Sequence, residues 1–230
     1  MGRLEVVEML LGREDVDPNG RSIATPLSFA ARQGHVEVVE MLLRRKDVRV
    51  QQHDGKGYTP LLWAAKLGRV EVVRVLLRRE DVDVNFCSLK GTTALSEAAL
   101  GGWVDVLALI MQRDEVDVNI CNVFGMSALA YAVVQDNVEA VEFLLQQPGL
   151  DVNARGDKGL TPLMFAARHG RIAILKLLMG CEAVDFHATD GKGRSALATA
   201  TESRQTKAVA LLLERDCVDV KARDKSGDGL

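Results

Sequence analysis

The sequence has few of the features that signal chemistry or membrane insertion. Its four cysteines form no C-x-x-C pair and have no histidine doublet nearby, so neither a disulfide framework nor a zinc site is predicted. No apolar stretch approaches the roughly 20 residues that span a bilayer. Acidic residues interrupt the apolar run of the N-terminal MGRLEVVEMLLGRED, so we expect no secretory leader. These absences favour a soluble intracellular protein, cytoplasmic or nuclear.

The numbers of basic and acidic residues are also nearly equal, at 29 and 32. The net charge is −3 at pH 7, which gives no overall attraction to nucleic acid or to a membrane surface. The chain is 47% hydrophobic and 27% charged, a composition that can bury a core and excludes a disordered chain.

A repeat of 34 residues organises the chain. Tripeptides of the form [TS]-[PA]-L recur at this spacing, at 25–27, 59–61, 93–95, 127–129, 161–163 and 195–197. A small pair, usually Ala-Ala, follows each tripeptide, and an apolar run such as VEVVEMLL (36–43) follows the pair. Three features in register over six copies indicate one structural unit repeated along the chain.

Each copy predicts two short helices and a turn. The Thr or Ser supplies an N-cap hydroxyl, and in three copies a proline follows at the first helical position. A glycine ends the first helix at 34, 68, 102 and 170, where the backbone needs a left-handed conformation. A second set of glycines marks hairpin tips, at 57, 91, 125, 159 and 193. We therefore expect stacked antiparallel helix pairs joined by β-hairpin loops.

This pattern resembles the ankyrin repeat, D-x-x-G-x-T-P-L-H-x-A-A-x-x-G, over residues 2–227. The resemblance implies an all-α fold, the ankyrin-repeat α-solenoid. Tetratricopeptide repeats share the 34-residue length, but their Trp, Gly and Tyr signature is missing. The usual ankyrin period is about 33 residues, and the longer spacing here is similar to that of ankyrin arrays in large fungal multidomain proteins.

The chain departs from the ankyrin pattern at two positions. The histidine of TPLH is absent from every copy, so its side-chain hydrogen bonds must be lost or replaced by Ser28, Leu62, Ser96, Ala130, Met164 and Ala198. Asp136 and Arg204 stand where glycine should end the first helix. We expect the fourth and sixth copies to be locally less stable, and Asp tolerates the left-handed region better than Arg does.

The repeats define the domain organisation. We expect one ankyrin-repeat domain over 1–230, with a partial repeat at 1–20, repeats at about 21–54, 55–88, 89–122, 123–156, 157–190 and 191–224, and a partial hairpin at 225–230. Neither end resembles a polar capping repeat, so we expect a piece of a longer array or multidomain protein. The first connector, 12–24, is two residues shorter than the others, which predicts an irregular hairpin.

In ankyrin repeats the variable face of the first helix and the hairpin tips line a concave groove that binds partners. One position on this face carries four of the ten aromatic residues, Phe29, Trp63, Tyr131 and Phe165, and Glu97 interrupts the series. Two interpretations are open. The rings either cover alanine surface between adjacent helices or form a stripe that anchors a partner's apolar side chains.

The same side of the repeats is expected to be basic, because lysine precedes the tip glycine in four copies. These lysines either solvate the tips or attract an acidic segment with apolar anchors. The candidate partner-binding residues are Phe29, Arg32, Lys56, Tyr58, Trp63, Lys66, Lys90, Phe124, Met126, Tyr131, Lys158, Phe165, Arg168 and Lys192.

Catalytic and cofactor motifs are not indicated. The DGKG segments at 54–57 and 190–193 lie in the hairpin slot and lack the context of a phosphate loop. The four histidines occupy four different repeat positions, and no serine or cysteine lies in a nucleophile motif. Cys87 and Cys121 lie one repeat apart, too far for a disulfide. We expect no enzyme activity, no cofactor and no metal.

The resemblance implies a protein-interaction module that binds a partner protein or peptide on its concave groove. A second hypothesis is a non-catalytic regulatory or targeting segment of a larger enzyme or signalling NTPase. Nucleic-acid binding is a third, which the basic tips permit and the overall acidity discourages. We expect no nucleic-acid partner, no membrane insertion, and a monomer or a part of a longer chain.

Overall fold

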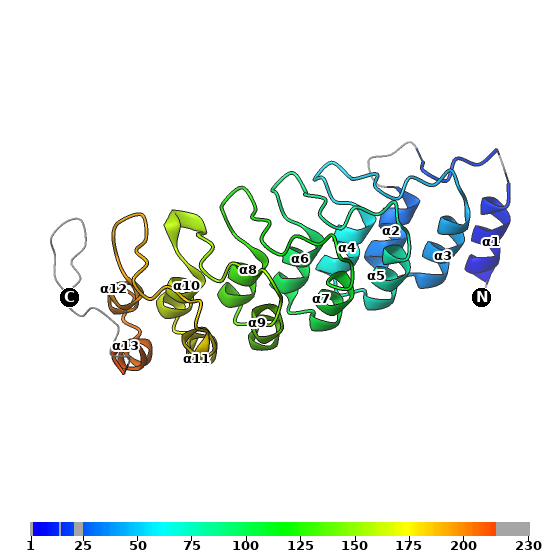
Figure 1. Ribbon diagram of the computed structural model, residues 1–230. Coiled ribbons are helices and arrows are strands. Elements are labelled where there is room, and N and C mark those ends of the chain that lie inside the picture. Colours follow the sequence, from blue (N-terminus) through cyan, green and yellow to red (C-terminus); the bar gives the residue numbers. More distant parts are fainter. Residues whose placement is uncertain (1, 14, 21–24, 215–230) are drawn as a thin grey trace. The chain divides into compact units, whose positions relative to one another are not determined.

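The computed structural model describes residues 2–13, 15–20 and 25–214 (Figure 1). All regular structure in these ranges is helical, without a β-strand. The chain divides into two compact units, residues 1–117 (unit 1) and 118–230 (unit 2). The single domain expected over 1–230 stays a prediction. Parts of the first connector (14 and 21–24), the end of the last repeat and the partial hairpin lie outside the described residues, so the predicted irregular hairpin does too.

The described residues of unit 1 form three complete helix pairs and one additional helix. Its helices are α1 (Gly2–Leu11), α2 (Pro26–Gln33), α3 (Val36–Arg44), α4 (Pro60–Lys66), α5 (Val70–Leu77), α6 (Ala94–Gly101) and α7 (Val104–Ile110). The first helices of the repeats, α2, α4 and α6, pack side by side in one row. The second helices, α1, α3, α5 and α7, form another row, and each first helix packs on the second helix that follows it (Figure 1).

Unit 2 repeats this arrangement, with three helix pairs in its described residues, 118–214. Its elements are α8 (Ala128–Val134), α9 (Val138–Leu145), the 3₁₀ turn η1 (Asp157–Gly159), α10 (Pro162–His169), α11 (Ile172–Gly180), α12 (Ala196–Glu202) and α13 (Thr206–Leu213). The first helices α8, α10 and α12 stack on one another, and so do the second helices α9, α11 and α13. The predicted all-α repeat fold is confirmed.

Hydroxyl caps begin the first helices as the sequence predicts. The side chains of Thr25, Thr59, Thr93, Ser127, Thr161 and Ser195 each accept a hydrogen bond from the backbone N–H three residues later, at 3.0–3.3 Å. Each bond satisfies an N–H that has no partner within the helix. The three predicted prolines, Pro26, Pro60 and Pro162, occupy the first helical position.

The ends of the first helices have the predicted left-handed conformation. Gly34, Gly68, Gly102 and Gly170 have φ between 62° and 80°. Asp136 and Arg204 take the same conformation in the fourth and sixth copies, with φ of 63° and 56°. The left-handed backbone conformation is therefore retained in the two copies that lack the glycine.

The TPLH histidine is replaced in two different ways. Ser96 accepts a hydrogen bond from the backbone N–H of Thr93 at 2.9 Å and completes a reciprocal cap. Leu62 and Met164 are each 1% exposed and contribute apolar packing instead. The lost hydrogen bonds are thus replaced by a shorter polar side chain or by hydrophobic contact.

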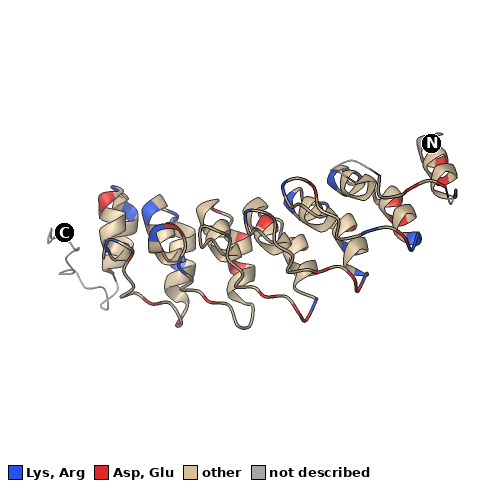
Figure 2. Ribbon diagram, turned by 90° about the horizontal axis from the view of Figure 1, so that it is seen from above, with Lys and Arg blue, Asp and Glu red and all other residues tan. Residues whose placement is uncertain are grey.

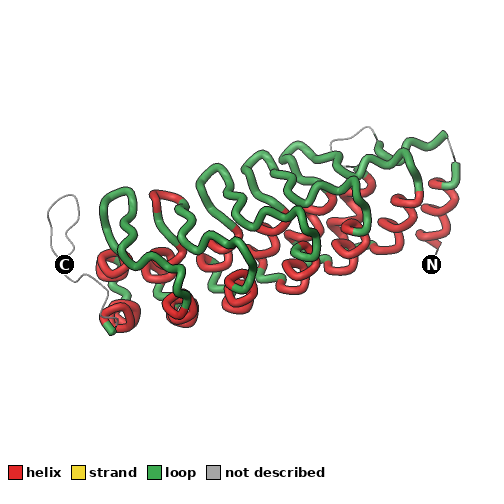
Figure 3. The backbone as a smooth tube through the Cα atoms, viewed as in Figure 1, coloured by secondary structure: helices red, strands yellow, loops and turns green. Residues whose placement is uncertain are grey.

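The connectors fold back as hairpin-shaped loops, but they form no strands in the described residues (Figure 3). In the second connector the N–H of Asp54 donates to the carbonyl of Tyr58 at 3.0 Å, and the N–H of Gly57 donates to the carbonyl of Asp54 at 2.9 Å. A single backbone bond joins this tip to the next, from the N–H of Leu89 to the carbonyl of Lys56 at 3.2 Å. One bond per neighbour is too few for a β-ladder.

Asparagines join the turns that follow successive second helices. The Nδ2 of Asn85 donates to the carbonyl of Glu115 at 2.7 Å, and its Oδ1 accepts from the N–H of Asp117 at 2.9 Å. Asn19, Asn119 and Asn153 make equivalent pairs of bonds. Gln51 occupies this position in the second copy, and its Oε1 is buried without a hydrogen-bond partner. These bonds occupy the longer turn that replaces the usual glycine-capped one.

Arginines at the ends of second helices reach back to the preceding repeat. Arg79 donates from Nη1 to the carbonyl of Leu43 at 3.3 Å, and its Nε bonds Asp81 at 2.8 Å. Arg45 bonds the carbonyl of Leu11 at 3.1 Å in the same way. The side chain supplies a donor to a helix C-terminus, where carbonyls have no intrahelical partner. Helix α1 is thereby held in the row of second helices.

Candidate partner-binding surface

An aromatic and cationic cluster lies at the first helices of unit 1. Tyr58 precedes α4, Trp63 lies within α4, and their ring centroids are 4.7 Å apart. The indole N–H of Trp63 donates to Asp54 at 3.0 Å, and the guanidinium carbon of Arg32, in α2, lies 4.6 Å from the Trp63 ring centroid. We call Arg32, Asp54, Tyr58 and Trp63 the Trp63 cluster. Its contacts fix the orientation of the indole and leave the side chain half-buried.

Glu97 of α6 is the centre of a buried hydrogen-bond network next to this cluster. Its side chain is 3% exposed. It accepts hydrogen bonds from Lys66 Nζ at 3.0 Å, from Thr92 Oγ1 at 2.9 Å and from the Tyr58 hydroxyl. We call Tyr58, Lys66, Thr92 and Glu97 the Glu97 network. A buried carboxylate needs such donors, because an unpaired charge in the interior is strongly unfavourable.

The network also changes the ionisation of its members. Burial raises the pKa of Tyr58, and the hydrogen bond to Glu97 raises it further. Burial would lower the pKa of Lys66, but its hydrogen bonds to Tyr58 and Glu97 outweigh burial and raise it. Lys66 therefore stays protonated, with its ammonium group held against Glu97. Tyr58 and Lys66 are engaged with their own chain and offer little to a partner.

Sequence reasoning treated Glu97 as a gap in an aromatic stripe and missed this network. The available signal was a carboxylate in a slot that holds Phe, Trp, Tyr or Thr in the other copies. Such a residue needs a cation, and Lys66 lies one repeat earlier in the adjacent first helix. The spacing alone does not say whether the lysine turns toward Glu97 or toward solvent.

The predicted partner-binding residues differ in how much surface they present. Seven of them are exposed: Phe29, Arg32, Lys56, Lys90, Phe124, Lys158 and Lys192. Trp63, Lys66, Met126, Tyr131 and Arg168 are intermediate. Tyr58 and Phe165 are buried, at 9% and 7% exposure. The surface available for apolar contact is therefore that of Phe29, Trp63, Phe124 and Tyr131.

A basic hollow of about 360 Å³ lies on unit 2. Its lining comes from two loop tips, the end of α10 and the end of α12, and consists of Lys158, Arg168, Lys192, Arg194, Glu202 and Ser203. Arg168 and Lys192 have no carboxylate partner within the described part of the chain. Lys158 lies 3.9 Å from Asp157, at the limit of an ion pair. The hollow therefore carries cationic groups that an anionic ligand could reach.

Arg194 in this hollow is positioned by Asp190. Its Nε and Nη2 donate to Asp190 Oδ2 at 2.9 and 2.6 Å, and Nη1 pairs with Glu202. Burial would raise the pKa of Asp190, but hydrogen bonds from Arg194 and from the backbone N–H groups of Lys192 and Arg194 lower it overall. Asp190 therefore stays ionised and holds the loop tip and the arginine in one arrangement.

Exposed apolar side chains occur at the loop tips of both units. Leu89 in unit 1 is 71% exposed, and Val123 and Phe124 in unit 2 are 67% and 60% exposed. Sequence reasoning selected Phe124 and missed Leu89 and Val123. Their repeat position holds Gly55, Asp157 or Gly191 in other copies, so an apolar residue there was a detectable signal.

Charge is only partly separated between the two helix rows (Figure 2). Second helices also carry basic residues, at Arg44, Arg74, Lys176 and Lys207. Basic residues occupy the last turn of the first helices α2, α4 and α10. Acidic residues occupy the first turn of the second helices α3, α5, α7 and α9. Arg69 and Arg171 donate instead to carbonyls at the ends of neighbouring first helices, at 3.2 Å in each case.

The DGKG segments form loop tips, in which Gly57 and Gly193 have φ of 78° and 84°. Burial raises the pKa of the Cys87 thiol, which disfavours the reactive thiolate. Within the described ranges, no group of three His, Cys, Asp or Glu side chains could hold a metal ion. No helix in the same ranges is long and apolar enough to cross a membrane. Cys217 lies outside the described residues.

Stacked helix pairs with hydroxyl N-caps, left-handed helix ends and looped connectors define an α-helical repeat protein. The family model for ankyrin repeats matches three successive segments, residues 1–86, 80–156 and 148–224. The chain belongs to the ankyrin repeat family. Ankyrin repeats are generally protein–protein interaction modules and are typically non-catalytic. Comparison with curated protein sequences gave no match.

Proposed function

We propose that this protein binds an acidic, partly apolar segment of a partner protein and catalyses no reaction. The observation that carries the proposal is the basic hollow of unit 2, where Arg168 and Lys192 lack carboxylate partners among the described residues. A segment that carries carboxylates would form ion pairs with Arg168 and Lys192. Electrostatic attraction of this kind increases the association rate and selects the partner more than it raises affinity.

Apolar contacts would come from the neighbouring loop tip in unit 2. A Cβ at Gly125 would meet the carbonyl oxygen of Arg155 at 2.7 Å, and one at Gly159 would meet the backbone N of Gly191 at 3.1 Å. The tips at 123–125, 157–159 and 191–193 are therefore adjacent within unit 2. Val123 and Phe124 lie at the first tip of this series, Lys158 at the second and Lys192 at the third. A short extended peptide could contact both groups with little reordering of the protein.

Unit 1 offers a second surface of the same chemistry. Trp63 is held in place by Asp54 and carries Arg32 over its ring. Phe29, at the same repeat position in α2, is 57% exposed. Aromatic side chains that are already ordered contribute strongly to binding, because little rotamer freedom is lost. We propose this as an additional contact region for the same class of partner.

The proposal is tested with two fluorescein-labelled peptide pools. One pool alternates Asp or Glu with Phe or Leu, and the other carries Lys or Arg in place of the acids. Fluorescence anisotropy over a salt titration should show tighter binding of the acidic pool, weakening as salt rises. Replacing Arg168 and Lys192 together by alanine should reduce affinity on the order of tenfold.

Lys176 and Lys207 provide the matched control, because both are exposed lysines on second helices of unit 2. The Lys176→Ala and Lys207→Ala double variant removes the same charge and should bind normally. If both double variants weakened peptide binding equally, the loss would come from the change in net charge alone, which would contradict the proposal. Preference for the basic pool, binding insensitive to salt, or tighter binding to duplex or single-stranded nucleic acid would also contradict it.

A further inference from the structure

The basic hollow of unit 2 carries more positive charge than its own carboxylates neutralise. Four cationic side chains line it together with one carboxylate, that of Glu202. Asp190 and Glu202 engage Arg194, which leaves Lys158, Arg168 and Lys192. A ligand with a single carboxylate would neutralise only one of these three charges, so most of the excess would remain.

The three cations come from three segments whose backbones are held in place. Arg168 lies in the last turn of α10. Lys158 and Lys192 lie at adjacent loop tips, which a hydrogen bond joins from the N–H of Gly191 to the carbonyl of Lys158 at 2.8 Å. The cations therefore meet around one hollow without rearrangement of the backbone, which lowers the cost of binding an anion.

The loop tip that carries Lys158 also has a backbone donor without an acceptor. In four other tips, the side chain at the start of the turn accepts the N–H groups two and four residues later, at Asp54, Ser88, Asn122 and Asp190. Gly156 takes this position in the tip of Lys158. The N–H of Lys158 has no acceptor among the described residues, and its φ is 59°.

Packing explains why this tip has no capping side chain. A Cβ at Gly156 would meet Met126 Sδ and Phe165 Cε2, each at 3.0 Å. These side chains occupy the space that Asp190 or Asp54 uses in its own tip. Lys158 therefore offers an anion both its ammonium group and its backbone N–H.

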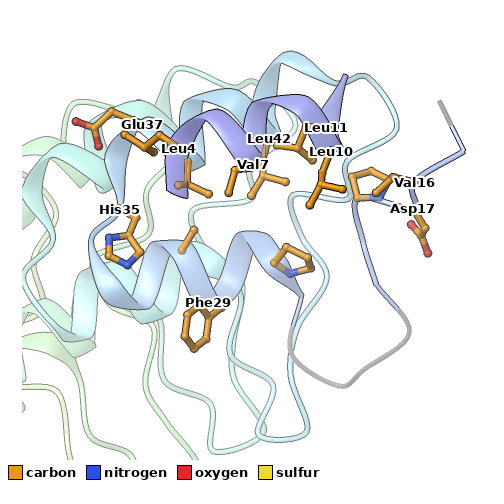
Figure 4. Close-up of a pocket in the computed structure, with 14 residues that line it drawn as sticks. Leu4, Val7, Leu10, Leu11, Val16, Asp17, Phe29, His35, Glu37 and Leu42 are labelled. Atoms are coloured by element: carbon orange, nitrogen blue, oxygen red, sulfur yellow. The ribbon is translucent and has the colours of Figure 1, made fainter. Parts of the chain in front are cut away.

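The apolar hollow of unit 1 has the opposite electrostatic character (Figure 4). It has a volume of about 570 Å³ between α1, α2 and the start of α3. Its lining includes Asp17 and Glu37 but no lysine or arginine. Its carboxylates would repel an anionic residue, whereas the basic hollow would attract one.

We propose that the basic hollow recognises a phosphorylated serine or threonine in the partner segment, which rests on the proposed function and specifies the residue that the hollow selects. A phosphoryl group carries a charge of about −1.5 to −2 at pH 7 and three acceptor oxygens. It pairs with the guanidinium of Arg168 and the ammonium of Lys192 together, and an oxygen remains for Lys158. Arginine suits this role because its planar group binds phosphate through two parallel hydrogen bonds.

The surroundings of the hollow favour a phosphopeptide over a phosphorylated lipid. Val123 and Phe124 lie at a neighbouring tip and are 67% and 60% exposed. Adjacent repeats are separated by about 8–10 Å, a distance that about three extended residues span. A peptide therefore reaches these apolar side chains from the hollow, and ankyrin repeats generally bind proteins.

The test compares three fluorescein-labelled peptides that differ only at the central residue, which is phosphoserine, glutamate or serine. Each peptide carries phenylalanine about four residues to either side of the centre. Fluorescence anisotropy with the 230-residue chain should show the phosphoserine peptide binding roughly tenfold more tightly than the glutamate peptide. The glutamate peptide should bind more tightly than the serine peptide.

Arg168→Gln should lower the ratio of the phosphoserine and glutamate affinities to about threefold or less, because it removes the paired donors. Lys192→Gln, at an exposed loop tip, should lower the same ratio independently of α10. Arg78→Gln is the matched control and should leave the ratio unchanged. Arg78 is an exposed arginine of unit 1 that has no carboxylate partner among the described residues and does not line the basic hollow.

Equal affinities for the phosphoserine and glutamate peptides would overturn this inference and leave the proposed function standing. A glutamate peptide that bound no more tightly than the serine peptide would contradict the proposed function instead. Equal effects of Arg168→Gln and Arg78→Gln would reduce the preference to net charge and also overturn the inference. So would tighter binding to vesicles that contain a phosphatidylinositol phosphate than to the phosphoserine peptide, because the hollow would then recognise a membrane surface.

Discussion

At the residue scale, a few polar side chains connect neighbouring repeats. Asn85 spans from its own turn to the next through both a donor and an acceptor, at 2.7 and 2.9 Å. Asparagine suits this role because its amide presents one donor group and one acceptor side by side. Gln51 has the same amide one methylene further out, and its oxygen is buried without a partner.

Gln51→Asn should therefore stabilise the protein. The shorter side chain should form two hydrogen bonds to the turn at residues 81–83, as Asn85 does one repeat later, and it removes a buried oxygen without a partner. We expect the free energy of unfolding, measured with urea, to rise by about 1–2 kcal/mol. Asn85→Gln is the reciprocal control and should lose a similar amount. A Gln51→Asn variant no more stable than the parent would show that the turn at 51 has a different geometry.

Glu97 accepts hydrogen bonds from three side chains, those of Tyr58, Lys66 and Thr92. Glu97→Ala leaves the Tyr58 hydroxyl and Thr92 Oγ1 without their acceptor. We expect a loss of about 2–4 kcal/mol in the free energy of unfolding. Lys66→Ala should cost at least as much, because it leaves the buried Glu97 carboxylate without its cation.

Urea unfolding of both variants checks this order. Glu71→Ala is the control, since Glu71 pairs with Arg74 at 3.3 Å on the surface and its side chain is 63% exposed. Its effect should stay below about 0.5 kcal/mol. A Glu97→Ala variant no less stable than Glu71→Ala would mean that the Glu97 network does not support the fold.

At the element scale, each helix is specified by its ends more than by its length. The first helices have 7–8 residues, too few to be stable in isolation. Hydroxyl caps, left-handed ends and contact with neighbouring helices make them stable here. Two copies keep the left-handed end without glycine, at Asp136 and Arg204. The weaker stability expected for these two copies stays a prediction.

Arg204→Gly should relieve the conformational cost at the end of α12. A side chain at φ of 56° is disfavoured by about 1–2 kcal/mol, and glycine removes this cost. Part of the gain is offset, because glycine also gives the unfolded chain more conformational entropy. We expect a net stabilisation of about 1 kcal/mol by urea unfolding. Asp136→Gly should gain less, because it breaks the ion pair with Arg171 at 3.1 Å. The reverse order would contradict this account.

At the scale of the whole molecule, the main helix contacts within each unit join adjacent repeats. Stability in such an array is a sum of repeat terms and neighbour terms, so local changes act locally. Ionised aspartates contribute in both units. The pKa of Asp54 is lowered because backbone N–H groups and Trp63 donate to it against the opposing effect of burial, and the pKa of Asp190 is lowered chiefly by Arg194.

Acid should therefore destabilise the protein through these carboxylates. Their folded pKa values lie below the unfolded value of about 3.9, so the unfolded chain binds more protons and stability rises with pH. The contribution is present above about pH 4 and is lost as pH falls through the folded values. Urea unfolding between pH 6 and pH 2 should show this loss, and Asp190→Asn should reduce it.

Asp114→Asn is the control for this series, because Asp114 is exposed. Its pH profile should follow that of the parent chain. An Asp190→Asn profile identical to the parent would show that Asp190 does not contribute to acid unfolding.

The sequence by itself determined the repeat, its helix pairs and their ends. TPL and SAL tripeptides, alanine pairs and terminal glycines act through contacts within about four residues, so periodicity and capping rules predict them. The family assignment and the position of the candidate surface on the first helices and tips depend on the same local signals. Phe29, Lys56, Phe124 and Lys192 are exposed there as expected.

Only the tertiary structure decided which side chains face a neighbour and which face solvent. Phe29 and Phe165 share a repeat position but differ in exposure, 57% against 7%, because different neighbours cover them. Glu97 and Lys66 come from adjacent repeats and form an ion pair at 3.0 Å. The repeat pattern assigns equivalent residues to the same position in the helix pair, whereas the burial of each side chain depends on the residues of the adjacent repeats.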